Sequence, residues 1–376
     1  MKNCSLLVHD FALPEGDVPN GKLHAKPSAV GYTAQQGAAK ALLLSHLMPP
    51  IESEPAQSLT IVRVEGKYWA AVNASCMFLL AALIAVAATP SAGQTTIPFT
   101  YVDNRIVVEC KVDGQGPFTM ILDTGSPSIA VTPETAAKLA IAVKDAASVT
   151  GAGNNAAKNG RAAIATLSLG SLTFNSLNAD VLDLTEIRTK LHFPHLDGII
   201  GYPILKRFAT FVDVDDKTIT LAATAPPMPP NATTTSFEGV LPEIHAVIDG
   251  IAGTVLVDSG DRSSLTLFGP FAKHNRFFGR YPSRENIVTG YGLGGPVYAD
   301  VFTLPSLDVF GTHLTNVVAR ASRQTGGVFA STAASASIGT GVLKRFNIVY
   351  DYPHNTIVAW PSKYFTTPDR FVPPGS

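Results

Sequence analysis

The sequence contains the same three landmarks twice, in the same order and at nearly the same spacing. They are an apolar run ending in Asp-Thr/Ser-Gly, a Val-Thr-Gly-x-Gly segment, and a Gly-x-x-x-Leu-Lys-Arg-Phe segment. In order, they occupy residues 120–125 and 255–260, 149–153 and 288–292, and 201–208 and 339–346. The offsets are almost constant, at 258 − 123 = 135, 289 − 150 = 139 and 339 − 201 = 138. A shift this long exceeds the periods of solenoid repeats and indicates a duplicated domain.

Short segments typical of β-strands, separated by Gly- and Pro-containing turns, fill both repeats. Arg105–Val112 and residues 243–248 are each followed by an Asp-Gly turn and a second apolar strand, which ends at Asp123 or at Asp258. Pro133–Leu139 is the clearest helical segment. Regular short strands with few helices predict a mostly-β protein.

The repeats also predict the domain boundaries. We expect a first lobe at residues 97–222 and a second at residues 239–360, joined by a Pro- and Thr-rich linker at 223–238 and followed by a C-terminal tail at 361–376. Each lobe is long enough to form its own core. Both Asp motifs therefore belong to one chain, so a monomer is sufficient for a site that needs both.

The residues before the repeats carry a separate signal. Residues 77–88 form a twelve-residue apolar run, and small residues with one proline follow up to residue 92. This composition is typical of a signal peptide and is short for a membrane span, although a buried core helix is an alternative. Residues 1–76 stay unassigned: either the true start lies near Met77, or the run is an internal signal-anchor. We expect a secreted or periplasmic protein, held at a membrane only if residues 77–88 form an uncleaved anchor.

Composition argues against several other partners. The formal net charge is −1 and charged residues make up 15%, so neither nucleic acid nor an anionic membrane is indicated. Of the three cysteines, only Cys110 lies within the repeats, where no disulfide can form. We expect Cys110 to be a small core residue rather than a nucleophile. No His or Cys cluster has metal-ligand spacing, and we expect neither a metal nor a cofactor.

Two carboxylates at the ends of equivalent strands have a chemistry that one carboxylate lacks. Two carboxyl groups within hydrogen-bond reach cannot both ionise, so they share a proton. A water molecule between them then meets a base and an acid at once. Asp123 and Asp258 are therefore the candidate catalytic pair.

The order of these motifs resembles the aspartic proteases, in particular the retropepsin-like type in a fused two-copy form. Residues 121–126 match that family's Asp loop, residues 199–201 match its apolar-apolar-Gly element, and residues 258–260 match the Asp loop again. The resemblance covers roughly residues 97–360. It implies two homologous acid-protease-like β lobes with the active-site cleft between them, and an aspartic endopeptidase acting on a peptide or protein substrate.

The resemblance also implies roles for neighbouring residues. Thr124 and Ser259 would hydrogen-bond across to the opposite Asp loop, although a simple turn hydroxyl is the alternative. The residues expected to support the catalytic loops are Thr124, Gly125, Ser126, Ser259 and Gly260. Residues 149–153 and 288–292 would be the tips of two substrate-covering flaps, although plain hairpin turns are the alternative. The expected flap residues are Gly151, Ala152, Gly153, Gly290, Tyr291 and Gly292.

Two departures from the family pattern lie in the second repeat. Asp261-Arg262 follows the second Asp loop where the first has Ser126-Pro127, and Ser337 stands where an apolar residue is expected. A third carboxylate near the pair would disfavour its ionisation and move activity to higher pH, unless Arg262 pairs with Asp261. The departures favour a non-catalytic peptide-binding protein with the same fold, whereas the two retained Asp favour catalysis. A β-rich structural protein whose motifs are only turns is a third alternative, which the constant offset opposes.

Overall fold

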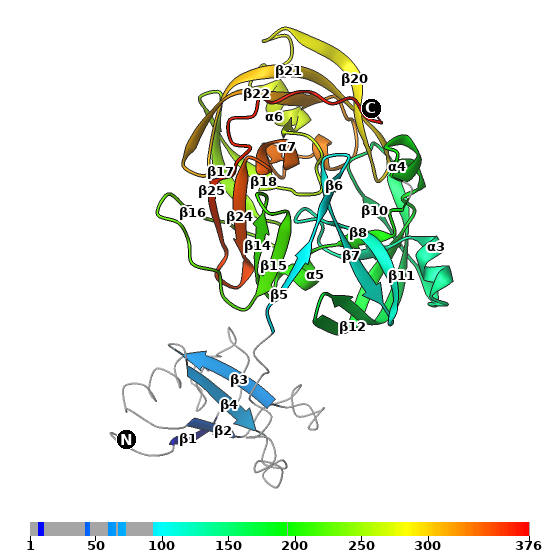
Figure 1. Cartoon of the computed structure of the whole chain (residues 1–376), viewed down its shortest axis with the longest axis vertical. Helices are drawn as coiled ribbons and strands as arrows, with labels where there is room; N and C mark the ends of the chain where they lie inside the picture. Colours follow the sequence, from blue (N-terminus) through cyan, green and yellow to red (C-terminus); the bar gives the residue numbers. More distant parts are fainter. Residues whose placement is uncertain are drawn as a thin grey trace, which may run out of the picture. The chain divides into compact units, whose positions relative to one another are not determined.

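The computed structural model describes residues 7–10, 42–45, 59–64, 67–72, 93–193 and 195–375. The chain divides into two compact units, Met1–Pro90 and Ser91–Ser376 (Figure 1). The predicted signal segment, residues 77–92, lies outside the described residues. The strands described in the first unit form a sheet of order β1-β2-β4-β3. Their bounds are Leu7–Asp10 (β1), Leu42–Ser45 (β2), Leu59–Val64 (β3) and Lys67–Val72 (β4).

The second unit is mostly β, as the sequence predicts. Its strands up to residue 222 are β5 (Thr95–Pro98), β6 (Thr100–Val102), β7 (Arg105–Val112), β8 (Gln115–Leu122), β9 (Ile129–Val131), β10 (Val143–Thr150), β11 (Ala156–Leu169), β12 (Leu172–Leu182), β13 (Gly198–Ile200), β14 (Ala209–Asp213) and β15 (Thr218–Ala222). The later strands are β16 (Thr233–Ser236), β17 (Glu243–Ile248), β18 (Ile251–Val257), β19 (Leu265–Leu267), β20 (Ser283–Gly292), β21 (Gly295–Val309), β22 (Thr312–Ser322), β23 (Ala336–Ile338), β24 (Phe346–Asp351) and β25 (Thr356–Pro361).

The helices of this unit are short. They are α3 (Pro133–Lys138), α4 (Thr185–Lys190), α5 (Tyr202–Leu205), α6 (Gly269–His274) and α7 (Thr340–Leu343), with 3-10 turns η4 (Val328–Ala330) and η5 (Tyr352–His354). Helix α3 begins at the predicted Pro133, because Pro suits the first helical turn and the Thr132 hydroxyl accepts a hydrogen bond from the Thr135 N–H.

Two sheets of this unit have matching strand orders, and the first has one additional strand, β6, at its edge. Residues 93–222 are here called the first half, and residues 239–360 the second half. The sheet within the first half has the order β10-β11-β12-β9-β13-β8-β7-β6, and the sheet within the second half has the order β20-β21-β22-β19-β23-β18-β17. In each sheet the strand that precedes an Asp motif pairs in parallel with a short strand, β8 with β13 and β18 with β23. Strands β9, β19 and β23 are buried along their whole length, so Thr266 on β19 and Ser337 on β23 are buried polar residues.

A third sheet joins strands from both halves. Its order is β16-β25-β24-β14-β15-β5, and β14 of the first half pairs antiparallel with β24 of the second. Part of the predicted linker belongs to it, because Thr233–Ser236 forms β16 and pairs with β25. The Thr run that we interpreted as linker composition is β-branched and suits a strand.

A buried apolar core extends through both halves and includes Phe118, Leu122, Val257 and Phe346. Cys110 belongs to it, and burial raises the pKa of its thiol to about 12. Cys110 is thus a packed core residue, as the sequence predicts, because a reactive thiol needs a lowered pKa.

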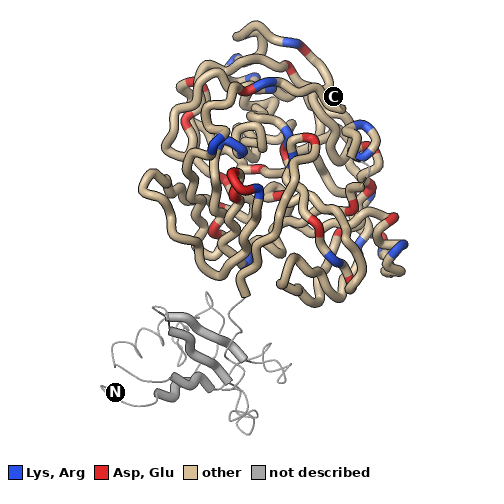
Figure 2. Tube along the Cα trace, in the orientation of Figure 1, with Lys and Arg blue, Asp and Glu red and all other residues tan. Residues whose placement is uncertain are grey.

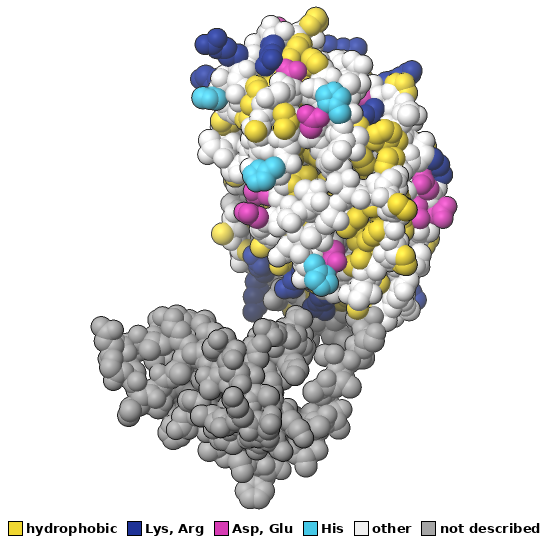
Figure 3. All heavy atoms as spheres, turned by 90° about the vertical axis from the view of Figure 1, so that its left-hand side faces the viewer, with side chains coloured by type: hydrophobic (Ala, Val, Ile, Leu, Met, Phe, Trp, Pro, Cys, Tyr) yellow, Lys and Arg dark blue, Asp and Glu magenta, His cyan; other side chains and the backbone are white. Residues whose placement is uncertain are grey.

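Charged side chains of both signs are interspersed over residues 93–375 (Figure 2). The face of the second unit that Figure 3 shows likewise mixes hydrophobic, acidic, basic and histidine side chains. Among the residues that the structure describes, no helix has the length and apolar character needed to cross a membrane.

Candidate active site

Asp123 and Asp258 occupy equivalent positions, each directly after a buried strand. The Asp123 N–H donates to the Ile200 carbonyl at 2.9 Å, and the Asp258 N–H donates to the Ile338 carbonyl at 2.9 Å. These bonds continue the parallel pairing of β8 with β13 and of β18 with β23. The sheets therefore fix where each Asp leaves its strand.

The two carboxyl groups lie close enough for each to shift the pKa of the other. A Cβ on Gly125 would lie 2.5 Å from the Asp258 carboxyl carbon, and a Cβ on Gly260 would lie 2.4 Å from that of Asp123. Each Asp Oδ1 also accepts the N–H of the glycine in its own loop, at 2.8 Å from Gly125 and 2.9 Å from Gly260. Glycine is needed here because each carboxylate packs directly over the backbone of the opposite loop.

The surroundings of the pair disfavour full ionisation. Burial is the largest cause that raises the pKa of Asp123, partly opposed by its hydrogen bonds and by the nearby Arg105. For Asp258, burial comes first and the charge of Asp123 second, and together they hold the pKa well above its usual range. Two adjacent carboxyl groups with raised pKa values share one proton.

Thr124 and Ser259 cross-link the two loops, the arrangement that the resemblance implies. The Thr124 hydroxyl donates to the Val257 carbonyl at 2.6 Å and accepts the Ser259 N–H at 2.9 Å. Ser259 reciprocates: its hydroxyl donates to the Leu122 carbonyl at 2.7 Å and accepts the Thr124 N–H at 3.0 Å. Both side chains are almost fully buried. Four buried hydrogen bonds thus hold the loops against each other, which fixes the relative position of the two carboxyl groups.

The Gly-bearing segments brace the loops from behind. A Cβ on Gly201 would lie 2.4 Å from the Ser126 carbonyl oxygen, and one on Gly339 would lie 2.3 Å from that of Ser263. The Ser126 carbonyl also accepts the N–H of Tyr202 at 3.0 Å. Ser126, predicted to support the first loop, therefore acts through its backbone as well as through a hydroxyl that donates to Ser128.

Asp261 does not pair with Arg262, contrary to the arrangement considered from the sequence. It pairs with Arg320, whose Nη2 lies 2.9 Å from Asp261 Oδ1, and both side chains are buried. The Ser337 hydroxyl donates to Asp261 Oδ2 at 3.2 Å, so the two residues that depart from the family pattern hydrogen-bond to each other. Although burial opposes ionisation, the Arg320 charge and several hydrogen bonds hold the pKa of Asp261 below its usual value.

Arg262 instead binds the first half. Its guanidinium pairs with Asp103 at 2.7 Å, and both side chains are buried. Asp103 also pairs with Arg105, whose Nε donates to the Gly260 carbonyl at 2.9 Å. The turn between β6 and β7 therefore anchors the second Asp loop through charged groups.

The two predicted flap segments belong to long hairpins, β10/β11 and β20/β21. Gly151, Ala152 and Gly153 lie in the turn of the first hairpin, as predicted. Gly290, Tyr291 and Gly292 lie instead at the end of strand β20. The turn follows them at Leu293-Gly294, where Gly294 has a φ of 90°. The predicted tip of the second flap is therefore wrong in position, because the turn needs a positive φ that glycine supplies.

The tips of the two hairpins contact each other. The Gly153 N–H donates to the Leu293 carbonyl at 2.9 Å, and the Asn155 N–H donates to the Gly294 carbonyl at 3.1 Å. Each tip also contacts the opposite half: the Ala152 carbonyl accepts a bond from Gln324, while Tyr291 and Leu293 pack on a cluster that includes Ile121. The hairpins thus bridge the halves in a closed arrangement.

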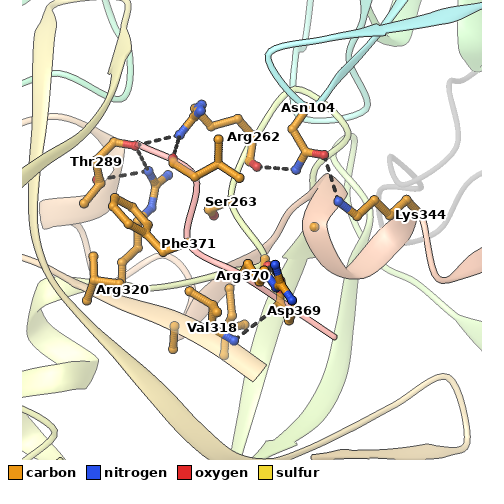
Figure 4. Close-up of a pocket in the computed structure, with 16 residues that line it drawn as sticks. Asn104, Arg262, Ser263, Thr289, Val318, Arg320, Lys344, Asp369, Arg370 and Phe371 are labelled. Atoms are coloured by element: carbon orange, nitrogen blue, oxygen red, sulfur yellow. Dashed lines mark hydrogen bonds between the residues drawn. The ribbon is translucent and has the colours of Figure 1, made fainter. Parts of the chain in front are cut away.

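The C-terminal tail passes beside the second Asp loop (Figure 4). Arg262 Nη1 donates to the Val372 carbonyl at 2.9 Å, and the Ser264 hydroxyl donates to Asp369 Oδ1 at 2.8 Å. Tail, loop and β22 enclose a cavity of about 40 Å³. Neither Asp123 nor Asp258 lines it, so this cavity is separate from the carboxyl pair.

Sequence reasoning missed four charged or polar residues around the second loop. They are Asp103, Arg105, Thr266 and Arg320. A usable signal existed for Arg320, a single charge within the apolar run Val317–Ala321. Within residues 93–193 and 195–375, no group of three or more His, Cys, Asp or Glu side chains is arranged to hold a metal ion.

Comparison with known proteins supports the resemblance for part of the chain. Residues 108–204 match the model of the aspartyl protease family, a segment that contains Asp123 and Gly201 but not Asp258. Among solved structures, the aspartic proteinase from Irpex lacteus is similar, with 16% identity, coverage of 74% of this chain and 100% of that chain, and a TM-score of 0.48. No curated protein matches the chain. The fold is aspartic-protease-like over the matched segment, while the two-copy form and the roles of the site residues in both halves stay predictions.

Proposed function

We propose that the protein is an aspartic-type endopeptidase, which hydrolyses peptide bonds with a water molecule activated between Asp123 and Asp258. One observation carries the proposal. The two carboxyl groups form a buried, adjacent pair with raised pKa values, held by loops that cross-link each other. Such a pair retains one proton under mildly acidic conditions and so offers a base and an acid to the same water.

In the proposed reaction, the ionised carboxylate takes a proton from the water as the water oxygen attacks the carbonyl carbon. The protonated carboxyl gives its proton to the carbonyl oxygen, which yields a tetrahedral diol. The carboxyl that now holds the proton gives it to the peptide nitrogen, while the other carboxylate takes a proton from a hydroxyl of the diol. The C–N bond breaks to give a carboxylic acid and an amine, and the pair again holds one proton. General acid–base catalysis of this kind contributes about 10²–10⁴-fold. Because the two Asp titrate as a pair, neither is assigned permanently as the base.

The hairpins supply the other part of the proposal. A peptide lying between the Asp loops and the two hairpins would be held in line with the carboxyl pair and shielded from bulk water. The tip contacts of Gly153 with Leu293 must open for a substrate to enter. Gly151 and Gly294 offer the backbone freedom for this motion.

We also propose that the substrate is a peptide or protein, that no cofactor takes part and that one chain is sufficient. Both Asp belong to the single compact unit Ser91–Ser376, which supports the last point. The proposal of export rests on the apolar run at residues 77–88. N-terminal sequencing of the mature protein tests it, and a mature chain that begins at Met1 would contradict it.

The test of the enzymatic proposal is digestion of a peptide library by the full chain from acidic to neutral pH. We expect cleavage that a pepstatin-type inhibitor blocks and that Asp123→Asn and Asp258→Asn each abolish. Asp216→Asn, in an exposed turn, is the matched control and should retain activity. Full activity in either active-site variant would refute the shared-carboxyl mechanism. If the wild type binds the inhibitor yet cleaves no peptide, the protein is a non-catalytic peptide binder.

A further inference from the structure

A buried ion pair joins Asp261 of the second Asp loop to Arg320 of β22, and the proposed cleavage reaction does not use it. The side chains of Asp261 and Arg320 are only 2% and 7% exposed. Asp261 also accepts hydrogen bonds from the Ser263 N–H at 2.9 Å and from the Thr266 hydroxyl at 2.8 Å. A charge buried this deeply is stable only when it is paired and hydrogen-bonded.

This ion pair is directly attached to the candidate catalytic Asp258. The Asp261 N–H donates to Asp258 Oδ1 at 3.1 Å and to the Asp258 carbonyl at 3.2 Å. The Asp261 carbonyl accepts the Thr340 N–H at 2.8 Å, which ties the same residue to the bracing segment. Any displacement of Asp261 therefore displaces a hydrogen-bond donor of the Asp258 carboxylate.

The ion pair also reaches the second hairpin. Arg320 Nη1 donates to the Thr289 hydroxyl at 3.1 Å, and Arg320 Nε donates to the Thr266 hydroxyl at 2.7 Å. Thr289 lies on β20 and is buried. Its carbonyl accepts a bond from Arg262 Nη1 at 3.2 Å (Figure 4). The Arg320 guanidinium thus connects one catalytic loop with Thr289, which lies four residues before the turn of the second hairpin.

The first half has no equivalent pair. Strand register places Arg320 opposite Thr266 and Asp180 opposite Ala130, so Asp180 is the positional counterpart of Arg320. Asp180 pairs with the exposed Arg161 and accepts a hydrogen bond from the Asn159 side chain. Ser126 takes the place of Asp261. An ion pair at this position therefore occurs beside the second Asp loop and not beside the first, so the shared strand order does not require it.

We propose that the Asp261–Arg320 ion pair is a positioning element of the active site, which fixes the second Asp loop against β20 and sets the pH range in which Asp123 and Asp258 share one proton. This inference rests on the proposed function, because it assigns the pair an effect on that acid–base chemistry. Asp261 acts through Asp258 and does not touch the substrate.

The charges around Asp258 determine the sign of the effect. It faces the carboxylates of Asp123 and Asp261, and Arg320 lies beyond Asp261 on β22. From the first half, Arg105 on β7 approaches Asp123, and Asp103 neutralises Arg262. The negative charge of Asp261 raises the pKa of both Asp258 and Asp123. Removal of that charge should therefore lower the pH at which the pair loses its shared proton.

The experiment compares pH profiles of kcat/KM for peptide cleavage by the full chain. Asp261→Asn keeps the shape and removes the charge, and we expect the upper pH limit of activity to move down by roughly one unit. Arg320→Lys keeps the positive charge, so its upper limit should stay near that of the wild type. The matched control is Asp180→Asn, which removes a mostly buried carboxylate from the Asp180–Arg161 ion pair of the first half. This variant should leave the upper pH limit unchanged.

A second measurement separates this inference from the proposed function. Carboxyl ¹³C NMR titration follows the protonation of the Asp pair without any need for catalysis. If the wild type cleaves no peptide, the endopeptidase proposal fails, and the titration still shows whether Asp261→Asn lowers the pH at which the pair ionises. If Asp261→Asn does not fold, Asp261→Asn/Arg320→Gln removes both charges together, and a smaller downward shift is expected, because loss of the Arg320 charge opposes loss of the Asp261 charge. A folded variant whose upper limit and titration are unmoved, or shift upward, would overturn the inference.

Discussion

The two Asp loops have nearly the same backbone and very different electrostatic surroundings. In both, the Asp carboxylate accepts the N–H of its own loop glycine and packs over the glycine of the other loop. Beyond that point they diverge: Ser126 bonds locally to Ser128, whereas Asp261 joins a buried network with Arg320. The comparison teaches that the two halves place their carboxyl groups in the same way, while the charges around those groups differ.

The charges that approach the pair from the first half add to this asymmetry. Arg105 lowers the pKa of Asp123 and donates to the Gly260 carbonyl. Its counterpart, counted from the matched Asp-Gly turns at Asp113 and Asp249 (249 − 113 = 136, and 105 + 136 = 241), is the uncharged Leu241. The halves therefore keep the geometry of the site in common and divide its electrostatic tuning unequally.

The largest expected effect tests the shared geometry. Gly125→Ala and Gly260→Ala would each place a methyl group within about 2.5 Å of the opposite carboxyl carbon. Loss of both the acid–base contribution and the positioning should reduce kcat by about 10⁴-fold in each variant. Gly93→Ala, where the added Cβ would meet only Leu172 at 3.9 Å, is the control. Unequal losses in the two glycine variants would show that the loops are not equivalent even in backbone.

The next effect tests the asymmetry. Asp261→Asn leaves the Arg320 charge buried without its partner, which should cost about 3–5 kcal/mol of unfolding free energy at neutral pH. Denaturant unfolding across pH measures it. Because the folded-state pKa of Asp261 is lowered, its stabilisation is present above its ordinary value of 3.8 and is lost as the pH falls through the folded value. The difference between wild type and variant should therefore shrink in acid.

Asp258→Asn should behave in the opposite way, within the same loop. Its folded pKa is raised, so Asp258 contributes most to stability below its ordinary value of 3.8 and loses that contribution as the pH rises through the folded value. The variant should therefore gain stability relative to the wild type on going from acidic to neutral pH. The same pH trend in both variants would show that Asp261 is not held ionised by Arg320.

A smaller effect concerns the cross-links that both loops share. Thr124→Ala removes two hydrogen bonds across the loops and leaves the buried Ser259 N–H without its acceptor. Ser259→Ala does the same to Thr124. We expect about 2–3 kcal/mol of destabilisation from each, measured by denaturant unfolding. Thr124→Ser keeps the hydroxyl and should recover most of the loss, and a failure to recover it would assign the effect to methyl packing.

The sequence predicted the features that local motifs encode. The Asp-Thr/Ser-Gly loops, the bracing glycines and the strand Arg105–Val112 follow from spacing and residue type within a few positions. The partner of Asp261 did not follow, because Arg320 reaches it through the pairing of β19 with β22, which joins residues 54 apart in the chain. Proximity in sequence suggested Arg262 as the partner of Asp261, but the pairing of β19 with β22 places Arg320 there instead.

Two further differences have local causes that the sequence does contain. The second hairpin turns at Leu293-Gly294 rather than at Gly290–Gly292, and the Gly294-Gly295 pair is the turn signal that we passed over. The Thr run of the predicted linker forms β16 because β25 offers it a partner, and this could not be known before the third sheet was seen. In both cases the sequence contains the local preference, a glycine pair for the turn and β-branched residues for the strand.

The smallest expected effect tests whether Ser337 serves Asp261. Ser337 is fully buried on β23, and its hydroxyl donates to Asp261 Oδ2, whereas the matching position of the first half (337 − 138 = 199) holds Ile199. Ser337→Ala removes one of the bonds that stabilise the ionised Asp261, which should cost about 1 kcal/mol at neutral pH. Ser171→Ala, in the exposed turn between β11 and β12, is the control for a serine lost from the surface.

The pH dependence of the Ser337→Ala cost decides its interpretation. If the hydroxyl stabilises the Asp261 carboxylate, the cost measured by denaturant unfolding should fall once Asp261 is protonated, because a neutral carboxyl gains less from the same donor. A cost that stays constant from neutral to acidic pH would instead reflect packing of the side chain in the core. In that case the presence of Ser at position 337 is independent of Asp261, and the two residues do not act together.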